Sequence, residues 1–210
     1  MRVALIVVMG VGVALSGCTS AKEPPPRADS TAPVIAPGRP GEDAKTLSPA
    51  EAATAVPSPT ANAADIRFMQ DMVVHHRQAL DMSLLAPTRA ASEKVKGLAS
   101  RIKDAQGPEI QYMSTWLQEQ GQKVPEHHAQ HQGMPGMATP LQLEQLKAAT
   151  GKAFDKLYLE LMINHHQGAI KMTGQVLTGG THIRVEELAN DIGVGQTAEI
   201  RRMREMLAGL

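Results

Sequence analysis

The sequence of 210 residues predicts an all-α protein, a four-helix bundle built from two tandem copies of one helical hairpin. The stretch Met-Val-Val-His-His at 72–76 recurs as Met-Ile-Asn-His-His at 162–166, and an offset of 90 residues aligns both flanks without a gap. Apolar residues recur every three or four positions through both copies, the period of an amphipathic helix. No strand pattern competes, so helices joined by short turns should form a bundle.

The N-terminal residues differ in composition from the repeats. Residues 1–17 resemble a lipoprotein signal peptide, because Arg2 precedes an apolar run at 3–15 that is too short for a stable membrane anchor. The following Leu-Ser-Gly-Cys at 15–18 resembles the lipobox of bacterial lipoproteins, in which the cysteine is lipidated. We therefore expect Cys18 to anchor the chain on the extracytoplasmic face of a bacterial membrane. An ordinary cleaved signal peptide with a stray thiol is the alternative.

Residues 18–61 are rich in Pro, Ala, Ser and Thr and have few large apolar residues. Such a composition cannot bury enough surface to fold, so we expect a disordered tether between the anchor and the bundle. The bundle itself is expected over 62–210.

The first repeat, about 62–120, should contain two helices. The first helix should begin at the N-cap Asn62 and stop before Pro87, because the residue preceding a proline is disfavoured in helical conformation. The second should run from about Ser92 to Gln120 with a kink at Gly107-Pro108, since proline removes a helical hydrogen bond.

The second repeat, about 140–210, follows a loop at 121–139. Thr139, Pro140 and Gln142 form a strong helix start, and that helix should run to about Thr178 with a bend at Thr150-Gly151. Gly179-Gly180 should make the turn into the last helix.

Charge and cysteine content exclude several functions. Lys and Arg number 21 and so do Asp and Glu, so no basic face is expected for nucleic-acid binding. The single cysteine excludes both an intrachain disulfide and a cysteine-based metal site. Neither a nucleophile with its base nor a Gly-rich phosphate loop is evident.

Histidine and methionine side chains share the inner face of the repeated helices. Thioethers and imidazoles together suit a soft metal, above all copper as Cu(I) or Cu(II). A methionine stripe is more often plain core, but duplication of the whole set favours metal binding. The candidate ligands are Met72, His75, His76 and Met82, with Met162, His165, His166 and Met172.

Each repeat also places one glutamate on an otherwise apolar helix face, expected to be buried. A histidine of the neighbouring helix is the expected partner. That pair could either lock the core or orient a metal-binding histidine. The candidates for ligands or supporting residues are Gln106, Glu109 and Met113, with Gln196, Glu199 and Met203.

The loop between the repeats forms a separate His/Met-rich tract. Its composition is typical of a flexible metal-binding segment, although a polar linker that happens to contain histidines is the alternative. Its candidate ligands are His127, His128, His131, Met134 and Met137.

These motifs resemble the bacterial secreted proteins grouped as domain of unknown function 305. The segments that carry the resemblance are 72–82 with 106–113, and 162–172 with 196–203. The resemblance implies a ferritin-like four-helix bundle and copper handling through the matched His and Met side chains. It leaves the enzymatic activity of the family open.

The sequence therefore favours a membrane-anchored copper-binding lipoprotein that sequesters copper or passes it to a delivery partner, without catalysis. A di-metal carboxylate enzyme of the ferritin-like kind is one alternative, although such sites use Glu-x-x-His segments that this chain lacks. The other alternative is a metal-free interaction module in which His and Glu form buried polar networks.

Overall fold

The computed structural model describes residues 34–36, 43–48, 51, 60–126 and 133–210. The predicted signal peptide, Cys18 and most of the predicted tether lie outside these residues. The chain divides into two compact units, Met1–Val56 and Pro57–Leu210. No helix among the described residues is long and apolar enough to cross a membrane.

In the first unit, β1 (Val34–Ala36) pairs with β2 (Lys45–Leu47) in antiparallel register, with Ile35 opposite Thr46. We expected no regular structure in this part of the tether, and the structure differs at these six residues. β-branched residues favour strands and account for the pairing, although a hairpin of two strands is marginally stable by itself.

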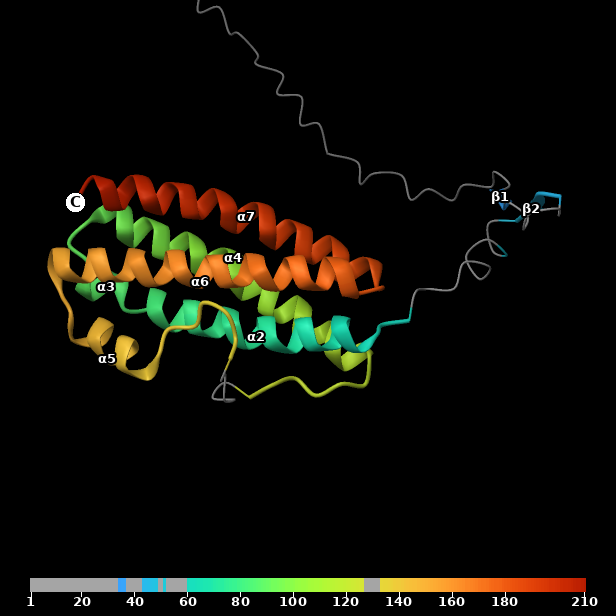
Figure 1. Ribbon diagram of the computed structural model, residues 1–210, viewed down its shortest axis with the longest axis horizontal. Coiled ribbons are helices and arrows are strands. Elements are labelled where there is room, and N and C mark those ends of the chain that lie inside the picture. Colours follow the sequence, from blue (N-terminus) through green and yellow to red (C-terminus); the bar gives the residue numbers. More distant parts are fainter. Residues whose placement is uncertain (1–33, 37–42, 49–50, 52–59, 127–132) are drawn as a thin grey trace, which may run out of the picture. The chain divides into compact units, whose positions relative to one another are not determined.

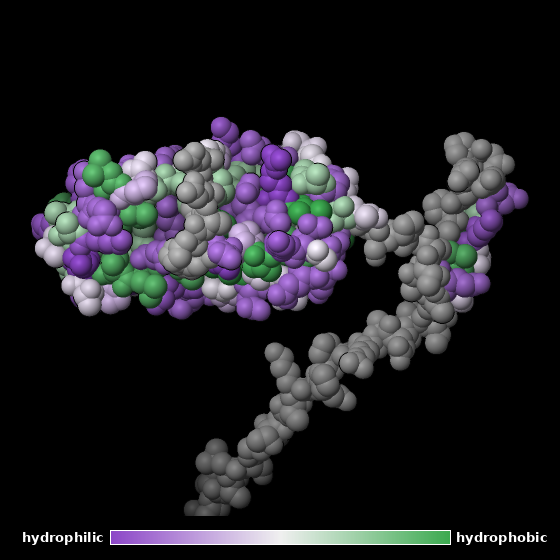
Figure 2. Space-filling view, turned by 90° about the horizontal axis from the view of Figure 1, so that it is seen from below, coloured by the Kyte–Doolittle hydropathy of each residue, from purple (hydrophilic) through white to green (hydrophobic). Residues whose placement is uncertain are grey.

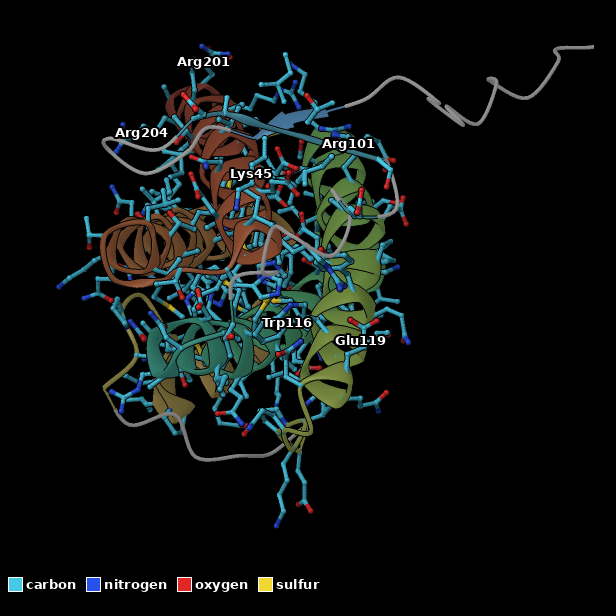
Figure 3. All side chains as sticks on the ribbon, turned by 90° about the vertical axis from the view of Figure 1, so that its right-hand side faces the viewer. Lys45, Arg101, Trp116, Glu119, Arg201 and Arg204 are labelled. Carbon is cyan, nitrogen blue, oxygen red and sulfur yellow. The ribbon has the colours of Figure 1, made fainter. Side chains whose placement is uncertain are left out.

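The second unit is the predicted bundle. Its long helices are α2 (Ala63–Ser83), α4 (Glu93–Glu119), α6 (Gly151–Gly179) and α7 (Ile183–Ala208). α2 pairs with α4 and α6 pairs with α7, and the two hairpins meet mainly through α2 and α6 (Figure 1). Seen along the bundle, Trp116 points to the interior, whereas Arg201 and Arg204 point outward (Figure 3). The four-helix bundle is confirmed.

Two helix boundaries differ from prediction near prolines and glycines. The helix predicted to end before Pro87 ends at Ser83, and a short helix, α3 (Ala86–Arg89), follows with Pro87 in its first turn. The helix predicted over 140–178 is two helices, α5 (Pro140–Ala148) and α6. Prediction of a single bent helix was wrong because Ala149 and Thr150 are extended and Gly151 has a φ of +63°, a left-handed conformation that favours glycine. α4 continues on both sides of Pro108.

The bundle core contains two clusters of buried apolar side chains. One cluster contains Met82, Met162 and Met203, and α5 contributes Leu146 to it. The other contains Met72, Met113 and Met172 together with Trp116. The offset of 90 residues converts each set of three methionines into the other, so the two clusters are equivalent under the pseudo-twofold relation of the hairpins.

Two buried aspartates join the hairpins reciprocally. Asp65 of α2 accepts hydrogen bonds from the backbone N–H of Thr181, before α7, at 3.1 and 3.2 Å. Asp155 of α6, its repeat equivalent, accepts from the N–H groups of Ala91 and Ser92, before α4, at 3.2 and 2.9 Å. Both side chains are 1% exposed. Each hairpin thus satisfies the unpaired donors at the start of a helix in the other.

Replacement of Asp155 by Asn should lower the free energy of unfolding by about 1–3 kcal/mol, because a buried, charge-assisted acceptor of two backbone hydrogen bonds is lost. Chemical denaturation of the wild type and the variant measures this change. Asp191→Asn, at an exposed position of α7, is the control and should be neutral. Equal stability of the Asp155 variant and the wild type would contradict a role in joining the hairpins.

Candidate metal centre

Four histidines lie at the middle of the bundle, two from α2 and two from α6. His75, His76, His165 and His166 are each 0% exposed. Both members of each pair are therefore buried, although adjacent residues of a helix diverge by about 100°. His75 and His165 face the opposite hairpin. His76 and His166 face the partner helix of their own hairpin.

His75 and His165 meet between the two hairpins. Their ring centroids are 3.8 Å apart and the ring planes are inclined by 35°. His75 Nε2 lies 3.0 Å from the carbonyl oxygen of Pro135. A carbonyl oxygen only accepts, so Nε2 of His75 carries the proton and donates it. Neither ring nitrogen of His165 makes a hydrogen bond among the described residues.

His76 and His166 each pair with a glutamate of the next helix. His76 Nε2 lies 2.7 Å from Glu109 Oε2, and His166 Nε2 lies 2.6 Å from Glu199 Oε2. The predicted His–Glu partnership is confirmed in both repeats. The glutamates are less buried than predicted, because their side chains keep 28% and 17% of their exposure while both imidazoles have none. Water therefore reaches the carboxylates and lowers the cost of their charge.

This pairing fixes the tautomer of both histidines. An ionised carboxylate only accepts hydrogen bonds, so Nε2 carries the proton of a neutral His76 or His166. Nδ1 is then left with a lone pair, and Nδ1 of each residue is buried without a hydrogen-bond partner in the part of the chain that the structure describes. A histidine that donates to a carboxylate through one nitrogen and offers the other is oriented as a metal ligand usually is.

Two glutamines repeat the same pattern of unsatisfied groups. Gln106 is 2% and Gln196 is 4% exposed, and neither the amide nitrogen nor the amide oxygen of either makes a hydrogen bond among the described residues. A buried unsatisfied polar group costs about 1–3 kcal/mol. Such groups lie at equivalent positions of both repeats, and they are candidates to contact a polar or ionic ligand.

The predicted methionines are buried in the two clusters described above, and each cluster combines methionines of both hairpins. Met72 precedes His76 by one helical turn, and Met162 has the same relation to His166. Among the described residues, no three His, Cys, Asp or Glu side chains converge closely enough to hold a metal ion. An ion in this interior would therefore require methionine thioethers beside imidazole nitrogens. That donor set is soft and suits Cu(I).

The predicted loop tract is only partly described. His127, His128 and His131 lie outside the described residues. Met134 and Met137 belong to a described strap, residues 133–139, and both are half-buried. Met134 packs against the cluster of Met72, Met113 and Met172. These two methionines are thus part of the bundle surface, whereas the sequence had suggested a flexible segment.

The strap crosses α2 and α6 in a way that the sequence analysis did not predict. Gln78 of α2 donates to the carbonyl of Ala138 and accepts from its N–H, at 3.0 and 2.7 Å. On α6 the strap lies so close to Gly168 that a Cβ there would overlap Pro135. Gly168 is the repeat equivalent of Gln78. The sequence contained one signal of the strap, because the long side chain of Gln78 is replaced by glycine at the matched position of the second repeat.

Burial and the neighbouring histidines His75, His166 and His76 hold the pKa of His165 well below its ordinary value of 6.5. A proton on this ring would be desolvated and close to other imidazoles. His165 is therefore neutral in the folded protein at neutral pH, with a lone pair on one ring nitrogen.

In metal-free buffer with a chelator, the free energy of unfolding should fall as the pH drops below about 6.5. Unfolded His165 takes up a proton in this range and folded His165 does not, so one such site contributes about 1.4 kcal/mol per pH unit. Urea denaturation between pH 7.5 and 5 measures the slope. The His165→Gln variant should lose this part of the slope, and an unchanged slope would contradict the assignment.

Comparison with known proteins supports the resemblance seen in the motifs. The family model of the domain of unknown function (DUF305) matches residues 65–207. No curated protein matches the chain. A DUF305 fragment from Deinococcus radiodurans is 35% identical, with a TM-score of 0.67, over 72% of this chain and 100% of its own. A DUF305 protein from Streptomyces coelicolor is 33% identical, with a TM-score of 0.65, over 70% and 93%.

The protein CopM has the same fold. Its Cu(II)-bound form is 34% identical to this chain, with a TM-score of 0.61, over 69% of this chain and 96% of that one. Its Cu(I)-bound form is 31% identical, with a TM-score of 0.59, over the same shares.

Proposed function

Because the chain belongs to the family of the domain of unknown function 305, we propose that it is an extracytoplasmic copper-binding lipoprotein. It sequesters copper or passes it on through the His and Met side chains of the duplicated motif, without catalytic turnover. Lipidated Cys18 holds it at the outer face of the membrane, and residues 18–61 connect this anchor to the bundle.

The observation that carries the proposal is the pair of oriented histidines. His76 and His166 each donate from Nε2 to a glutamate, and the buried Nδ1 of each has no hydrogen-bond partner within residues 60–126 and 133–210. Methionine thioethers lie one helical turn away in both repeats. CopM, which shares the fold, has been solved with Cu(II) and with Cu(I). An imidazole with thioethers suits Cu(I), and the histidines at the centre also suit Cu(II).

The residues that would hold copper form two sets, and each set contains methionines of both hairpins. The first set is His76 with Met72 and Met113 of its own hairpin and Met172 of the other. The second set is His166 with Met162, Met203 and Met82. His75 and His165 lie between the two sets. Glu109 and Glu199 would orient the imidazoles of His76 and His166.

Replacement of both Met72 and Met162 by Leu should weaken Cu(I) binding at least tenfold, because each set loses one thioether while leucine keeps the packing. Competition with a chromophoric Cu(I) chelator, on the purified full-length protein, measures the affinity. Met69→Leu is the matched control, since the repeat equivalent of Met69 is Leu159.

The double variant Glu109→Gln, Glu199→Gln in the same titration should lose about 10- to 100-fold in affinity, because the imidazoles lose the carboxylates that orient them. If neither the methionine double variant nor the glutamate double variant changes the copper affinity, the proposal is contradicted. That result would favour a metal-free module in which the His–Glu pairs only stabilise the bundle.

Replacement of Cys18 by Ser should move the protein from the membrane fraction to the soluble extracytoplasmic fraction, because the lipid attachment is lost. Fractionation of cells and detection of the bundle by antibody measure this. A wild-type protein that is already soluble would show that residues 1–17 act as an ordinary signal peptide.

A further inference from the structure

The two methionine clusters are equivalent in sequence but differ in access to solvent. Met172 of the first set keeps 6% of its exposure, whereas its repeat equivalent in the second set, Met82, has 0%. Met162 and Met203, the other members of the second set, are also 0% exposed. The difference has a local cause, because a pocket opens onto Met172.

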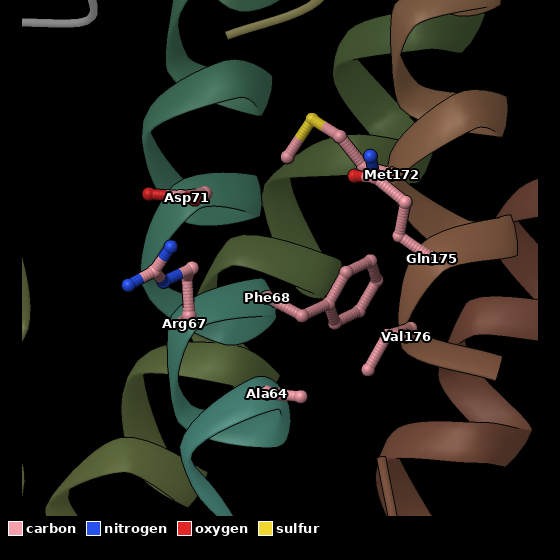
Figure 4. Close-up of a pocket in the computed structure, with 7 residues that line it drawn as sticks. All are labelled: Ala64, Arg67, Phe68, Asp71, Met172, Gln175 and Val176. Carbon is pink, nitrogen blue, oxygen red and sulfur yellow. The ribbon is translucent and has the colours of Figure 1, made fainter. Parts of the chain in front are cut away.

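The pocket lies between α2 and α6 and has a volume of about 120 Å³. Its lining includes Phe68 from α2 and Met172 and Val176 from α6. Figure 4 shows Phe68 reaching from α2 toward α6 and Met172 reaching back toward α2. One water molecule needs roughly 15 Å³, so the pocket has room for an ion together with the small ligand that delivers it.

Polar and small residues keep this pocket open. Arg67, Asp71 and Gln175 also line it, and Ala64 leaves room near the start of α2. The face of the molecule seen from below is mostly hydrophilic, with scattered apolar residues (Figure 2). Arg67 and Asp71 have opposite charges, so charge gives the pocket little preference for a cation. The thioether of Met172 would supply the preference, because sulfur ligands select soft ions.

Three of the equivalent positions in the other half carry apolar side chains in place of small or polar ones. Phe154 stands where Ala64 is, Leu161 where Asp71 is, and Leu85 where Gln175 is. Phe154 is 0% and Leu161 is 6% exposed, and both belong to the cluster around Met82. Leu146 of α5 is buried in that cluster as well.

From this asymmetry we propose that the pocket is the port through which a soft monovalent cation, Cu(I) or Ag(I), reaches the set of Met72, Met113 and Met172. The set of Met82, Met162 and Met203 exchanges its ion slowly, because its equivalent opening is plugged. This inference rests on the proposed function. It adds that one set serves transfer and the other storage.

The first test needs no metal. The metal-free full-length protein is treated with dilute hydrogen peroxide, and oxidation of each methionine is followed by peptide mass spectrometry at early times. Met172 should be oxidised at least tenfold faster than Met82, since the peroxide enters the same port. Equal oxidation rates for Met172 and Met82 would contradict the proposed port, regardless of which ion the protein binds.

The second test closes the port with residues of the plugged half. The variant Ala64→Phe, Gln175→Leu should protect Met172 from peroxide and slow transfer of one Cu(I) or Ag(I) ion to a chelator at least tenfold in stopped-flow measurements. The amount of ion bound at equilibrium should stay the same. Ala63→Phe, the same substitution at an exposed neighbouring position, is the control and should transfer as the wild type does.

The outcomes separate the port from the function on which it rests. A wild-type protein that binds neither ion would overturn both. A plugged variant that binds both ions, protects Met172 and still transfers them at the wild-type rate would overturn the port alone.

Discussion

Burial of four imidazoles at the meeting of two hairpins is the constraint on which the rest of the structure depends. A buried imidazole must be neutral or paired, because a charge without water or a partner is costly. Two of the rings obtain a carboxylate partner, His75 obtains a backbone carbonyl, and His165 packs against His75. The helices must hold these contacts in one register, and the reciprocal bonds of Asp65 and Asp155 join the hairpins in that register.

Duplication explains the architecture, and the departures from it explain how the halves differ. Both repeats keep the histidines, the glutamates, the methionines and the buried aspartates at matched positions. In the second half, Leu146 of α5 packs with Phe154 and Leu161 around Met82, Met162 and Met203. The strap binds the first half through Gln78 and passes over the second at Gly168. Two methionine clusters that are equivalent in sequence thereby have different surroundings.

Thioethers make this interior unlike that of a carboxylate-rich bundle. Each methionine packs as an ordinary core residue in this structure. His76, His166 and the two glutamines are different, because their buried polar atoms without a hydrogen-bond partner among the described residues cost stability. Relief of that cost on binding would add to the affinity of the interior for a cation.

The sequence by itself determined the bundle, because apolar periodicity and a repeat of 90 residues leave few other ways to bury both inner faces. It also identified the His–Glu partners, since a glutamate on an apolar face of one helix needs a partner on the next. Only the tertiary structure decided that both histidines of each pair are buried and which nitrogen of His76 donates to the glutamate. These depend on the rotation of the helices and on contacts between residues distant in sequence, which helical spacing does not specify. The broken helix at Gly151, the strap over Gly168 and the pocket beside Met172 arise in the same way, because each reflects the packing of one half against the other.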